Sequence, residues 1–292
     1  AKLIFRCMQK NQRILIIGDF DADGATSTAL FIRALNSFGF TNAHYLVPNR
    51  FEFGYGLTPE IVEVAAKFKP TLIITVDNGI SSIEGVAAAK SKGFDVLITD
   101  HHLPGNDLPG ADVIINPNQP DDKFPSKNLA GVGVVFYVLS ALRTLLREQG
   151  WFAEINIEEP NLAQFLDIVA VGTIADVAKL DFNNRILVDQ GLRRIRAGKC
   201  CAGVRALFMI AGKNLAQISS SDLGFIIGPR LNAAGRLKDM SLGIECLLTN
   251  DQDQANLFAK QLSNLNEERK KIERKMQAQA LSILKDVNVS NN

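Results

Sequence analysis

The sequence predicts an α/β fold: an open, mainly parallel sheet flanked by helices, followed by a helical part and a long connecting helix. Short apolar runs rich in β-branched residues alternate with helical patterns over about the first 125 residues. Nearly continuous apolar runs are typical of strands buried on both faces of a parallel sheet. Alternation of strands and helices is typical of α/β domains. Beyond about residue 128 the patterns become mostly helical.

The elements of the first half follow from these runs and from their boundary residues. Arg13–Asp19 and Thr71–Asp77 show the strand pattern most clearly, since both are short and dense in Ile, Leu and Val. Gly93 stands where a helix ending at 92 is expected to stop. The expected strands are 13–19, 71–77, 95–100 and 112–116, with 44–47 as a further candidate. The expected helices are about 25–38, 59–68 and 82–92.

Helical patterns dominate the second half of the chain. From 251 to about 286 there is no Gly or Pro, and apolar residues recur at three- and four-residue steps. This periodicity predicts one long amphipathic helix, which ends near a polar tail at 288–292. The other expected helices are 131–148, 161–175, 184–196, 202–212 and 240–248.

Composition excludes several classes of protein. The chain has 292 residues, of which 47% are hydrophobic and 22% charged, so a disordered chain, a collagen and a coiled-coil rod are excluded. Its longest apolar run, Leu129 to Leu142, is shorter than the ~20 residues of a membrane-spanning helix, and no membrane partner is expected. The four cysteines form no C-x-x-C pair, which favours packing thiols and a reducing cytoplasm.

Charge is unevenly distributed along the chain, although the total is only +1. Residues 1–184 carry a net charge of −6, residues 185–238 carry +8, and residues 239–292 carry −1. The acidic part is either a solvated surface or a site that holds a cation. The basic part is either a solvated face or a patch that binds phosphates.

Carboxylates follow three of the predicted strands, at Asp19, Asp77 and Asp100. In open α/β sheets, ligands bind outside the carboxyl ends of the strands. Asp21 and Asp23 extend the first of these sites to three acids at alternate positions, which repel one another unless a cation is present. The alternative is an acidic loop in water, or a helix cap by Asp23 over a helix beginning near Ala25.

Two of the three histidines, His101 and His102, follow Asp100 directly. Strand-end carboxylates with an imidazole suit Mn²⁺ or Mg²⁺ better than zinc or copper. Asp176 ends an apolar helical pattern, where a carboxylate faces the unfavourable end of the helix dipole, and a cation would explain it. Structural histidines and an exposed acid in a turn remain the alternatives.

Glycine and arginine gather in the segment 228–236, where Arg230 and Arg236 flank a small-residue turn. Guanidinium groups beside closely approaching backbone suit a phosphate, and a surface turn capped by arginine is the alternative. The glycine-rich segment 129–134 either brings backbone near a ligand or allows tight helix packing, the second being favoured.

These segments carry a family resemblance. Four of them resemble, in order, the four motifs of the DHH phosphoesterase family, and 228–236 resembles an additional motif of the RecJ-type branch. Ile17 stands where other DHH branches usually carry a histidine, which favours the RecJ-type branch. The four motif segments are 19–24, 76–79, 100–102 and 172–176.

The resemblance implies a domain organisation. Residues 1–250 would form the DHH catalytic domain, with about 1–125 as the α/β sheet and 126–250 mostly helical. Residues 251–292 would form the long helix that connects it to a DHH-associated domain absent from this sequence.

The resemblance also implies two divalent ions at the strand ends, preferably Mn²⁺ with Mg²⁺ possible, bridged by Asp77. Two ions ~3.5–4 Å apart lower the pKa of a shared water and stabilise transition-state charge. The remaining ligands would be Asp19 and Asp21 for one ion, and Asp23, His101 and Asp176 for the other.

Other implied roles concern the substrate. Asp100 would orient the imidazole among the metal ligands, and His102 would contact the scissile phosphate. Arg230, Arg236 and Asn232 would hold backbone phosphates. The implied reaction is 5′→3′ degradation of single-stranded DNA to mononucleotides, in DNA repair and recombination. A monomer is expected, with a helicase or a single-strand-binding protein as plausible partners. The alternatives are a DHH phosphodiesterase for short oligonucleotides or small nucleotides, and a non-catalytic member that binds single strands.

Overall fold

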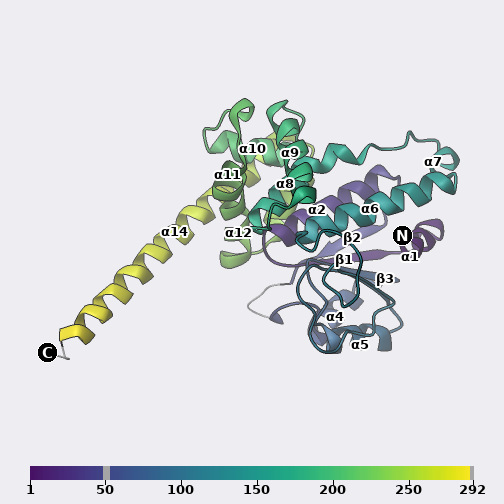
Figure 1. Cartoon of the computed structure of the whole chain (residues 1–292), viewed down its shortest axis with the longest axis horizontal. Coiled ribbons are helices and arrows are strands. Elements are labelled where there is room, and N and C mark those ends of the chain that lie inside the picture. The colour runs from purple at the N-terminus through teal and green to yellow at the C-terminus, as the bar shows by residue number, and fades with distance from the viewer. Residues whose placement is uncertain (49–52, 290–292) are drawn as a thin grey trace.

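A parallel five-stranded sheet forms the centre of the first half of the chain in the computed structural model, which describes residues 1–48 and 53–289 (Figure 1). The strand order is β2-β1-β3-β4-β5, and all four pairings are parallel. The predicted α/β class is therefore confirmed, including the candidate strand at 44–47. The strands are β1 (Ile14–Gly18), β2 (Ala43–Leu46), β3 (Leu72–Val76), β4 (Asp95–Thr99) and β5 (Val113–Ile115).

Helices cover both faces of the sheet because alternate residues of each strand point to opposite sides. On β1, Ile14 and Ile16 pack into a core with α1, α2 and α6, whereas Leu15 and Ile17 pack into a second core with α4 and α5. The sheet is thus buried on both faces, as its apolar strands predict. The covering helices are α1 (Lys2–Gln9), α2 (Ala22–Ser37), α4 (Pro59–Ala66), α5 (Ile83–Ser91) and α6 (Gly131–Glu148).

The start of α2 differs from the sequence-based expectation. This helix begins at Ala22, three residues before the expected position, and its N-cap is Asp21. The Asp21 carboxylate accepts hydrogen bonds from the N–H groups of Asp23 and Gly24, at 2.9 Å each. A cap by Asp23 is therefore wrong, because the Asp23 carboxylate is turned toward another helix.

The second half of the chain is helical, as predicted, and packs against α2 through a third core. The expectation of a turn at 228–236 is wrong, since these residues lie in α12, with Pro229 in its first turn, where its missing N–H is tolerated. The elements are α7 (Trp151–Glu154), η1 (Leu162–Phe165), α8 (Leu166–Ala175), α9 (Phe182–Arg196), α10 (Ala202–Ile210), η2 (Leu215–Gln217), α11 (Ser220–Asp222), the π-helix η3 (Leu223–Ile227), α12 (Gly228–Leu237) and α13 (Ser241–Leu248).

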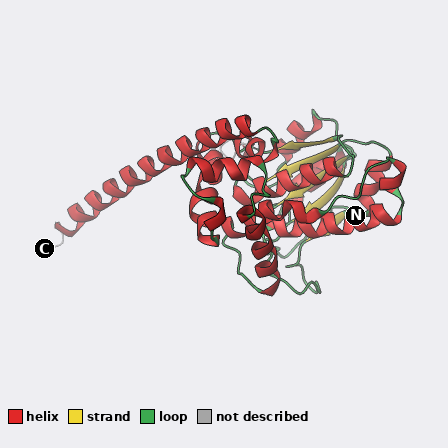
Figure 2. Cartoon of the chain, turned by 90° about the horizontal axis from the view of Figure 1, so that it is seen from above, coloured by secondary structure: helices red, strands yellow, loops and turns green. Residues whose placement is uncertain are grey.

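A single long helix, α14 (Gln252–Val289), ends the described chain and confirms the long amphipathic helix. Its first turns pack into the third core through Ala255, Ala259 and Leu262. Its later turns project away from the body of the molecule (Figures 1 and 2). Residues 290–292 of the expected segment 251–292 lie outside the described residues.

All four cysteines are free, two of them buried and two half-buried, in agreement with the expected packing role. Within the described ranges, no helix is both long enough and apolar enough to cross a membrane.

Candidate metal centre

Three aspartates lie at one edge of the sheet because each follows the carboxyl end of a strand. Asp19 follows β1, Asp77 follows β3 and Asp100 follows β4, and these three strands are neighbours. The strand order reverses direction between β1 and β3, with β2 on one side and β4 on the other. This reversal opens the crevice in which α/β sheets bind their ligands.

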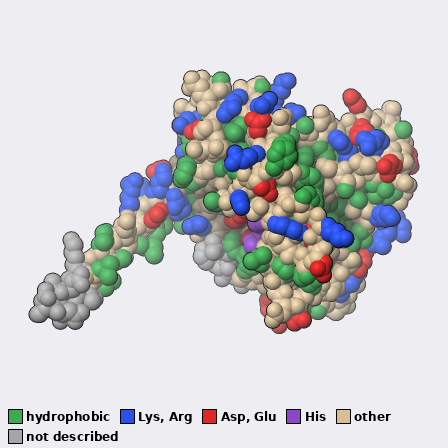
Figure 3. Space-filling view, in the orientation of Figure 1, with side chains coloured by type: hydrophobic (Ala, Val, Ile, Leu, Met, Phe, Trp, Pro, Cys, Tyr) green, Lys and Arg blue, Asp and Glu red, His purple; other side chains and the backbone are tan. Residues whose placement is uncertain are grey.

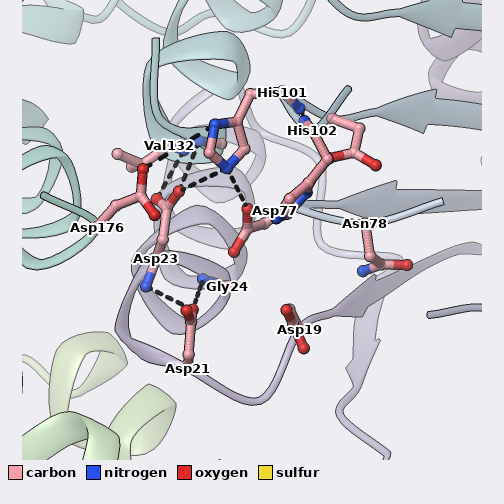
Figure 4. A network of polar contacts seen from close by, with 12 residues as sticks. Asp19, Asp21, Asp23, Gly24, Asp77, Asn78, His101, His102, Val132 and Asp176 are labelled. Atoms are coloured by element: carbon pink, nitrogen blue, oxygen red, sulfur yellow. Dashed lines mark hydrogen bonds and ion pairs between the residues drawn. The ribbon is translucent and has the colours of Figure 1, made fainter. Parts of the chain in front are cut away.

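The side chains at this edge form three overlapping groups of possible cation ligands (Figure 4). In each group the ligand atoms lie within 4.8 Å of one another. His101 connects the groups, since its Nε2 lies 3.0 Å from Asp77 Oδ1 and 3.8 Å from Asp23 Oδ2. The groups are Asp19, Asp21 and Asp77; Asp23, His101 and Asp176; and Asp77, His101 and His102. The first two contain the residues that the family resemblance assigns to two ions, and the third adds His102, which was expected to contact the phosphate.

Asp23 is held by the first turn of α6, far along the chain. Its carboxylate accepts hydrogen bonds from the N–H groups of Gly131 and Val132, at 2.6 and 2.9 Å. Free N–H groups at a helix N-terminus stabilise an anion. Gly131 is required here, because a Cβ at this position would lie 2.7 Å from the Cβ of Asp77. The glycine-rich segment thus combines tight helix packing with a contact to the site.

Asp77 adopts a left-handed backbone conformation, with φ +63°. Such a conformation costs an ordinary residue about 1–3 kcal/mol and is often found at functional sites. The buried side chain of Asn78 holds the turn, since its Nδ2 donates to the carbonyl oxygens of Ile17 and Val76, at 3.1 and 2.9 Å. The surrounding backbone therefore fixes the direction in which the Asp77 carboxylate points.

Asp100 orients His102 and not His101. Its carboxylate lies 2.7 Å from His102 Nδ1 and accepts a hydrogen bond from the N–H of Ile80 at 2.9 Å. Burial opposes ionisation of Asp100, but these hydrogen bonds outweigh it and lower its pKa. The same contact with Asp100 raises the pKa of His102 and favours an imidazolium. Its other nitrogen, Nε2, lies 3.4 Å from the hydroxyl of Tyr55.

The remaining carboxylates are difficult to ionise in the absence of a cation. Burial, followed by repulsion from neighbouring aspartates, raises the pKa of Asp19 to about 7 and that of Asp176 to about 6. The same two causes raise the pKa values of Asp23 and Asp77. A bound cation would remove this penalty, because it offsets the charge that these carboxylates impose on one another.

Two buried atoms indicate that the site fits a metal. Asp77 Oδ1 and His101 Nε2 face each other but have no hydrogen-bond partner with acceptable geometry among the described residues. Buried polar atoms without partners are rare in proteins and call for an explanation such as an ion. A donor set of aspartate oxygens with one imidazole nitrogen suits Mn²⁺ or Mg²⁺.

A cavity of about 1000 Å³ opens beside this centre. Asn232 and Arg236 of α12 line it, whereas Arg230 lies outside it and donates to the carbonyl oxygen of Ile226. Asn232 also accepts a hydrogen bond from the N–H of Ala22 at 2.8 Å, which fastens α12 to the start of α2. The cavity is otherwise lined by residues of 19–21, 55–60 and 79–85, together with Asp100 and His102.

Sequence reasoning missed the part of the site that surrounds the cavity. Tyr55 contacts His102 edge to face, with ring centroids 6.0 Å apart. Thr58, Ser81 and Ser82 place hydroxyl groups at the first turns of α4 and α5. No spacing in the sequence distinguishes these residues from ordinary turn and cap residues, because they meet the aspartates only after the sheet has formed.

A glycine substitution tests the packing between α6 and Asp77. Gly131→Ala should displace the Asp77 side chain and destabilise the fold by about 1–3 kcal/mol, as overpacking generally does. The increase in melting temperature that Mn²⁺ causes in the unchanged chain should disappear. Differential scanning fluorimetry with and without MnCl₂ measures both effects.

Gly133→Ala is the matched control in the same helix. A Cβ at Gly133 would approach only the side chain of Leu129, with 3.1 Å to Cδ2. This variant should keep the response to Mn²⁺, and loss of the response in both variants would refute the specific contact with Asp77.

A family model described as "DHH family, N-terminal domain" matches residues 13–173, which is more than half of the sequence. The chain belongs to the DHH family. In this DHH domain the matched segment contains Asp19 through His102, whereas Asp176 comes from the residues directly after it.

The relatives of this DHH protein are of the RecJ type. A protein of Dickeya dadantii named single-stranded-DNA-specific exonuclease RecJ is 57% identical over the whole chain, which covers 51% of that relative. The protein of the same name in Escherichia coli is 56% identical over 97% of this chain and 49% of its own length. The chain thus spans about half the length of the curated relatives it matches.

A solved structure agrees in fold with this DHH protein over nearly the whole chain. The crystal structure of exonuclease RecJ bound to manganese superposes with a TM-score of 0.83 at 34% sequence identity. The match covers 96% of this chain and 68% of that one. The protein is therefore a RecJ-type member of the DHH family.

Proposed function

We propose that this chain is the catalytic part of a metal-dependent exonuclease that hydrolyses single-stranded DNA to mononucleotides in the 5′→3′ direction. The observation that carries the proposal is the set of overlapping ligand groups that share Asp77 and His101, beside a cavity of about 1000 Å³. The names of the RecJ relatives support the substrate, and the manganese in the related crystal structure supports the cofactor.

Two divalent ions, preferably Mn²⁺, would be held by two of these groups, with Asp77 contributing to both. Asp19 and Asp21 would complete one site, and Asp23, His101 and Asp176 the other. Ions bound in this way lower the pKa of water and offset negative charge on a phosphate. The chain itself would hold Asp77 and Asp23 in position before an ion binds. The left-handed turn at Asp77 and the first turn of α6 would do so.

His102 would contact the scissile phosphate. Because Asp100 raises its pKa, His102 carries a positive charge over a wider pH range than a free imidazole does. Its Nε2 faces Tyr55 at the cavity, on the side away from Asp100. An imidazolium in this position would stabilise the charge that develops on the phosphate when the bond to the sugar oxygen breaks.

Arg236 and Asn232 would hold a phosphate of the backbone at the cavity, and Arg230 would hold another outside it. Contacts to phosphates carry no sequence information, so we expect little preference for particular bases. Glu60 and Glu84 also line the cavity and would keep additional phosphates away from part of its wall. This arrangement favours a strand whose terminal nucleotide alone lies in the cavity.

A second function follows from the size of the cavity. A volume of about 1000 Å³ also lies at the upper end of the range for small-molecule sites. A DHH phosphodiesterase acting on short oligonucleotides or small nucleotides is therefore the alternative. It would cleave dinucleotides faster than long strands, whereas an exonuclease would not.

The deciding experiment uses a long single-stranded DNA with a 5′-phosphate and a label at its 3′ end, incubated with Mn²⁺. We expect release of mononucleotides and progressively shorter strands that keep the label. If the first mononucleotides released carry the label, digestion starts at the 3′ end and runs in the opposite direction. If dinucleotides are cleaved but the long strand is not, the alternative function replaces this one.

The wider organisation is part of the same proposal. Residues 1–250 would form the catalytic domain, and 251–292 would connect it to a further domain. The projection of α14 away from the body supports this organisation. Four further properties remain predictions: a cytoplasmic location, a role in DNA repair and recombination, a monomeric state, and a helicase or single-strand-binding partner.

A further inference from the structure

Two hydrophobic side chains on neighbouring elements are almost fully exposed to solvent. Val177, which follows Asp176 directly, is 86% exposed, and Phe225 is 83% exposed. The elements that carry them are in contact, because η3 packs on the end of α8. A Cβ at Gly224 would lie 3.2 Å from Cγ2 of Ile174.

Val177 is held in a strained conformation. Its φ is +58°, and its N–H and that of Ala178 donate back to the carbonyl oxygens of Ile174 and Thr173. These two hydrogen bonds define a Schellman motif, in which glycine normally occupies the position of Val177. A β-branched residue in this conformation is a genuine outlier, and here no burial of the side chain compensates for the strain. The side chain therefore needs an explanation other than stability.

Phe225 lies in the π-helix η3, which leads directly into α12. Single π-helical turns are rare and are often found at functional sites. The helix that follows brings Asn232 and Arg236 to the cavity beside the aspartates. Phe225 thus lies directly before the helix that would contact the substrate, and it is not part of the third core.

The basic segment that contains Phe225 favours a polyanionic ligand. Residues 185–238 carry a net charge of +8, and Phe225 lies within this segment. Arg230, five residues further on, has a buried Nε with no hydrogen-bond partner in the described part of the chain. Figure 3 shows histidine side chains at the surface, with Lys, Arg and hydrophobic side chains around them.

We propose that Val177 and Phe225 form a platform on which one nucleobase of the single strand stacks next to the metal centre. The inference rests on the proposed function, since it assumes a nucleic acid strand in the site. Aromatic side chains beside a basic surface bind unpaired bases in this way, because every base offers an apolar face. A paired base has no free face, so the platform would also favour single strands over duplex.

The test measures binding without cleavage, with Asp77→Asn introduced into every protein to block the reaction. Fluorescence anisotropy gives the affinity for a labelled oligothymidylate, either intact or with one abasic residue placed at successive positions. Phe225→Ala should weaken binding of the intact strand about tenfold. An abasic residue at one position should cause the same loss in the parent protein and no further loss in Phe225→Ala.

The platform would be refuted if Phe225→Ala bound the intact strand as tightly as the parent protein does. It would also be refuted if the losses of affinity caused by Phe225→Ala and by the abasic residue were additive at every position. Phe225→Trp should restore tight binding, because tryptophan also stacks. Met209→Ala is the control, since Met209 is an exposed apolar residue on α10 and its loss should leave the affinity unchanged.

Val177→Gly distinguishes an effect of Val177 on strand binding from an effect on the stability of the fold. Glycine relieves the strain, so the melting temperature should rise by about 2–4 °C while affinity for the intact strand falls. A rise in melting temperature with unchanged affinity would remove Val177 from the platform. If the chain with unchanged Asp77 cleaves single strands but the abasic scan finds no coupling, this inference fails and the proposed function stands. If no strand is bound or cleaved, both fail.

Discussion

Asp77→Asn should reduce the rate of single-strand cleavage by on the order of 10³-fold, because removal of the shared ligand would disable both ion sites. Asp77 is 2% exposed, belongs to two of the three ligand groups, and its Oδ1 lies 3.0 Å from His101 Nε2. Asparagine keeps the shape of the side chain but removes the charge. The packing against Gly131 should therefore survive while cation binding is lost.

The measurement is the initial rate of mononucleotide release at saturating Mn²⁺, together with Mn²⁺ binding by titration calorimetry. Asp95→Asn is the matched control, since Asp95 begins β4 and forms a half-exposed ion pair with Arg6. Exposed pairs contribute little to stability, so this control should cleave at the normal rate. If Asp77→Asn keeps a tenth or more of the normal rate, the shared-ligand assignment is wrong.

The metal-free protein should be more stable at pH 5 than at pH 8. Burial and repulsion from Asp21 raise the pKa of Asp19 from 3.8 to about 7 in the folded protein. A carboxyl whose pKa is raised on folding favours the folded state while it is protonated, and this contribution is lost as pH rises through about 7. The two pH units between 5 and 7 correspond to roughly 3 kcal/mol for a single group, and the contribution changes little between pH 7 and 8.

Urea unfolding in EDTA at a series of pH values checks this prediction. Asp19→Asn should reduce the loss of stability between pH 5 and 8, and it should make the metal-free protein more stable at pH 8. Mn²⁺ should restore stability to the unchanged protein at pH 8, because binding to the folded state alone stabilises it.

Asp222→Asn is the control for this series. Hydrogen bonds from Ser219 and Lys213 lower the pKa of Asp222 to about 2, so its contribution is lost only in strong acid. The pH dependence between 5 and 8 should not change in this variant. A metal-free protein that becomes more stable from pH 5 to 8 would contradict the assignment of the buried aspartates.

Much of the fold was predictable from local patterns. The strands were recognised because their apolar runs reflect burial on both faces, a property of each run alone. The position of Asp19 and Asp77 after such runs predicted a site at the strand ends, because parallel strands all end at one edge. For the same reason, His101 and His102 were identified as candidates without any structure.

The roles of individual residues depended on contacts between distant parts of the chain. Local sequence favoured Asp23 as the cap of α2, whereas in the structure Asp21 caps α2 and Asp23 accepts a hydrogen bond from Gly131 of α6. Asp100 was expected to orient the metal-binding imidazole of His101, but in the structure its carboxylate lies against the ring of His102 instead.

The segment 228–236 illustrates the physical limit of local reasoning. Gly228, Pro229 and Gly235 favour a turn when only local preference is considered. In the folded protein these small residues allow α12 to approach its neighbours, since a Cβ at Gly235 would lie 1.8 Å from the carbonyl oxygen of Phe20. The sequence by itself determined the strands and the acidic edge, because each apolar run indicates a strand buried on both faces and parallel strands all end at one edge. Only the tertiary structure decided how α6 and α12 close on that edge, because helix packing overrides local propensity.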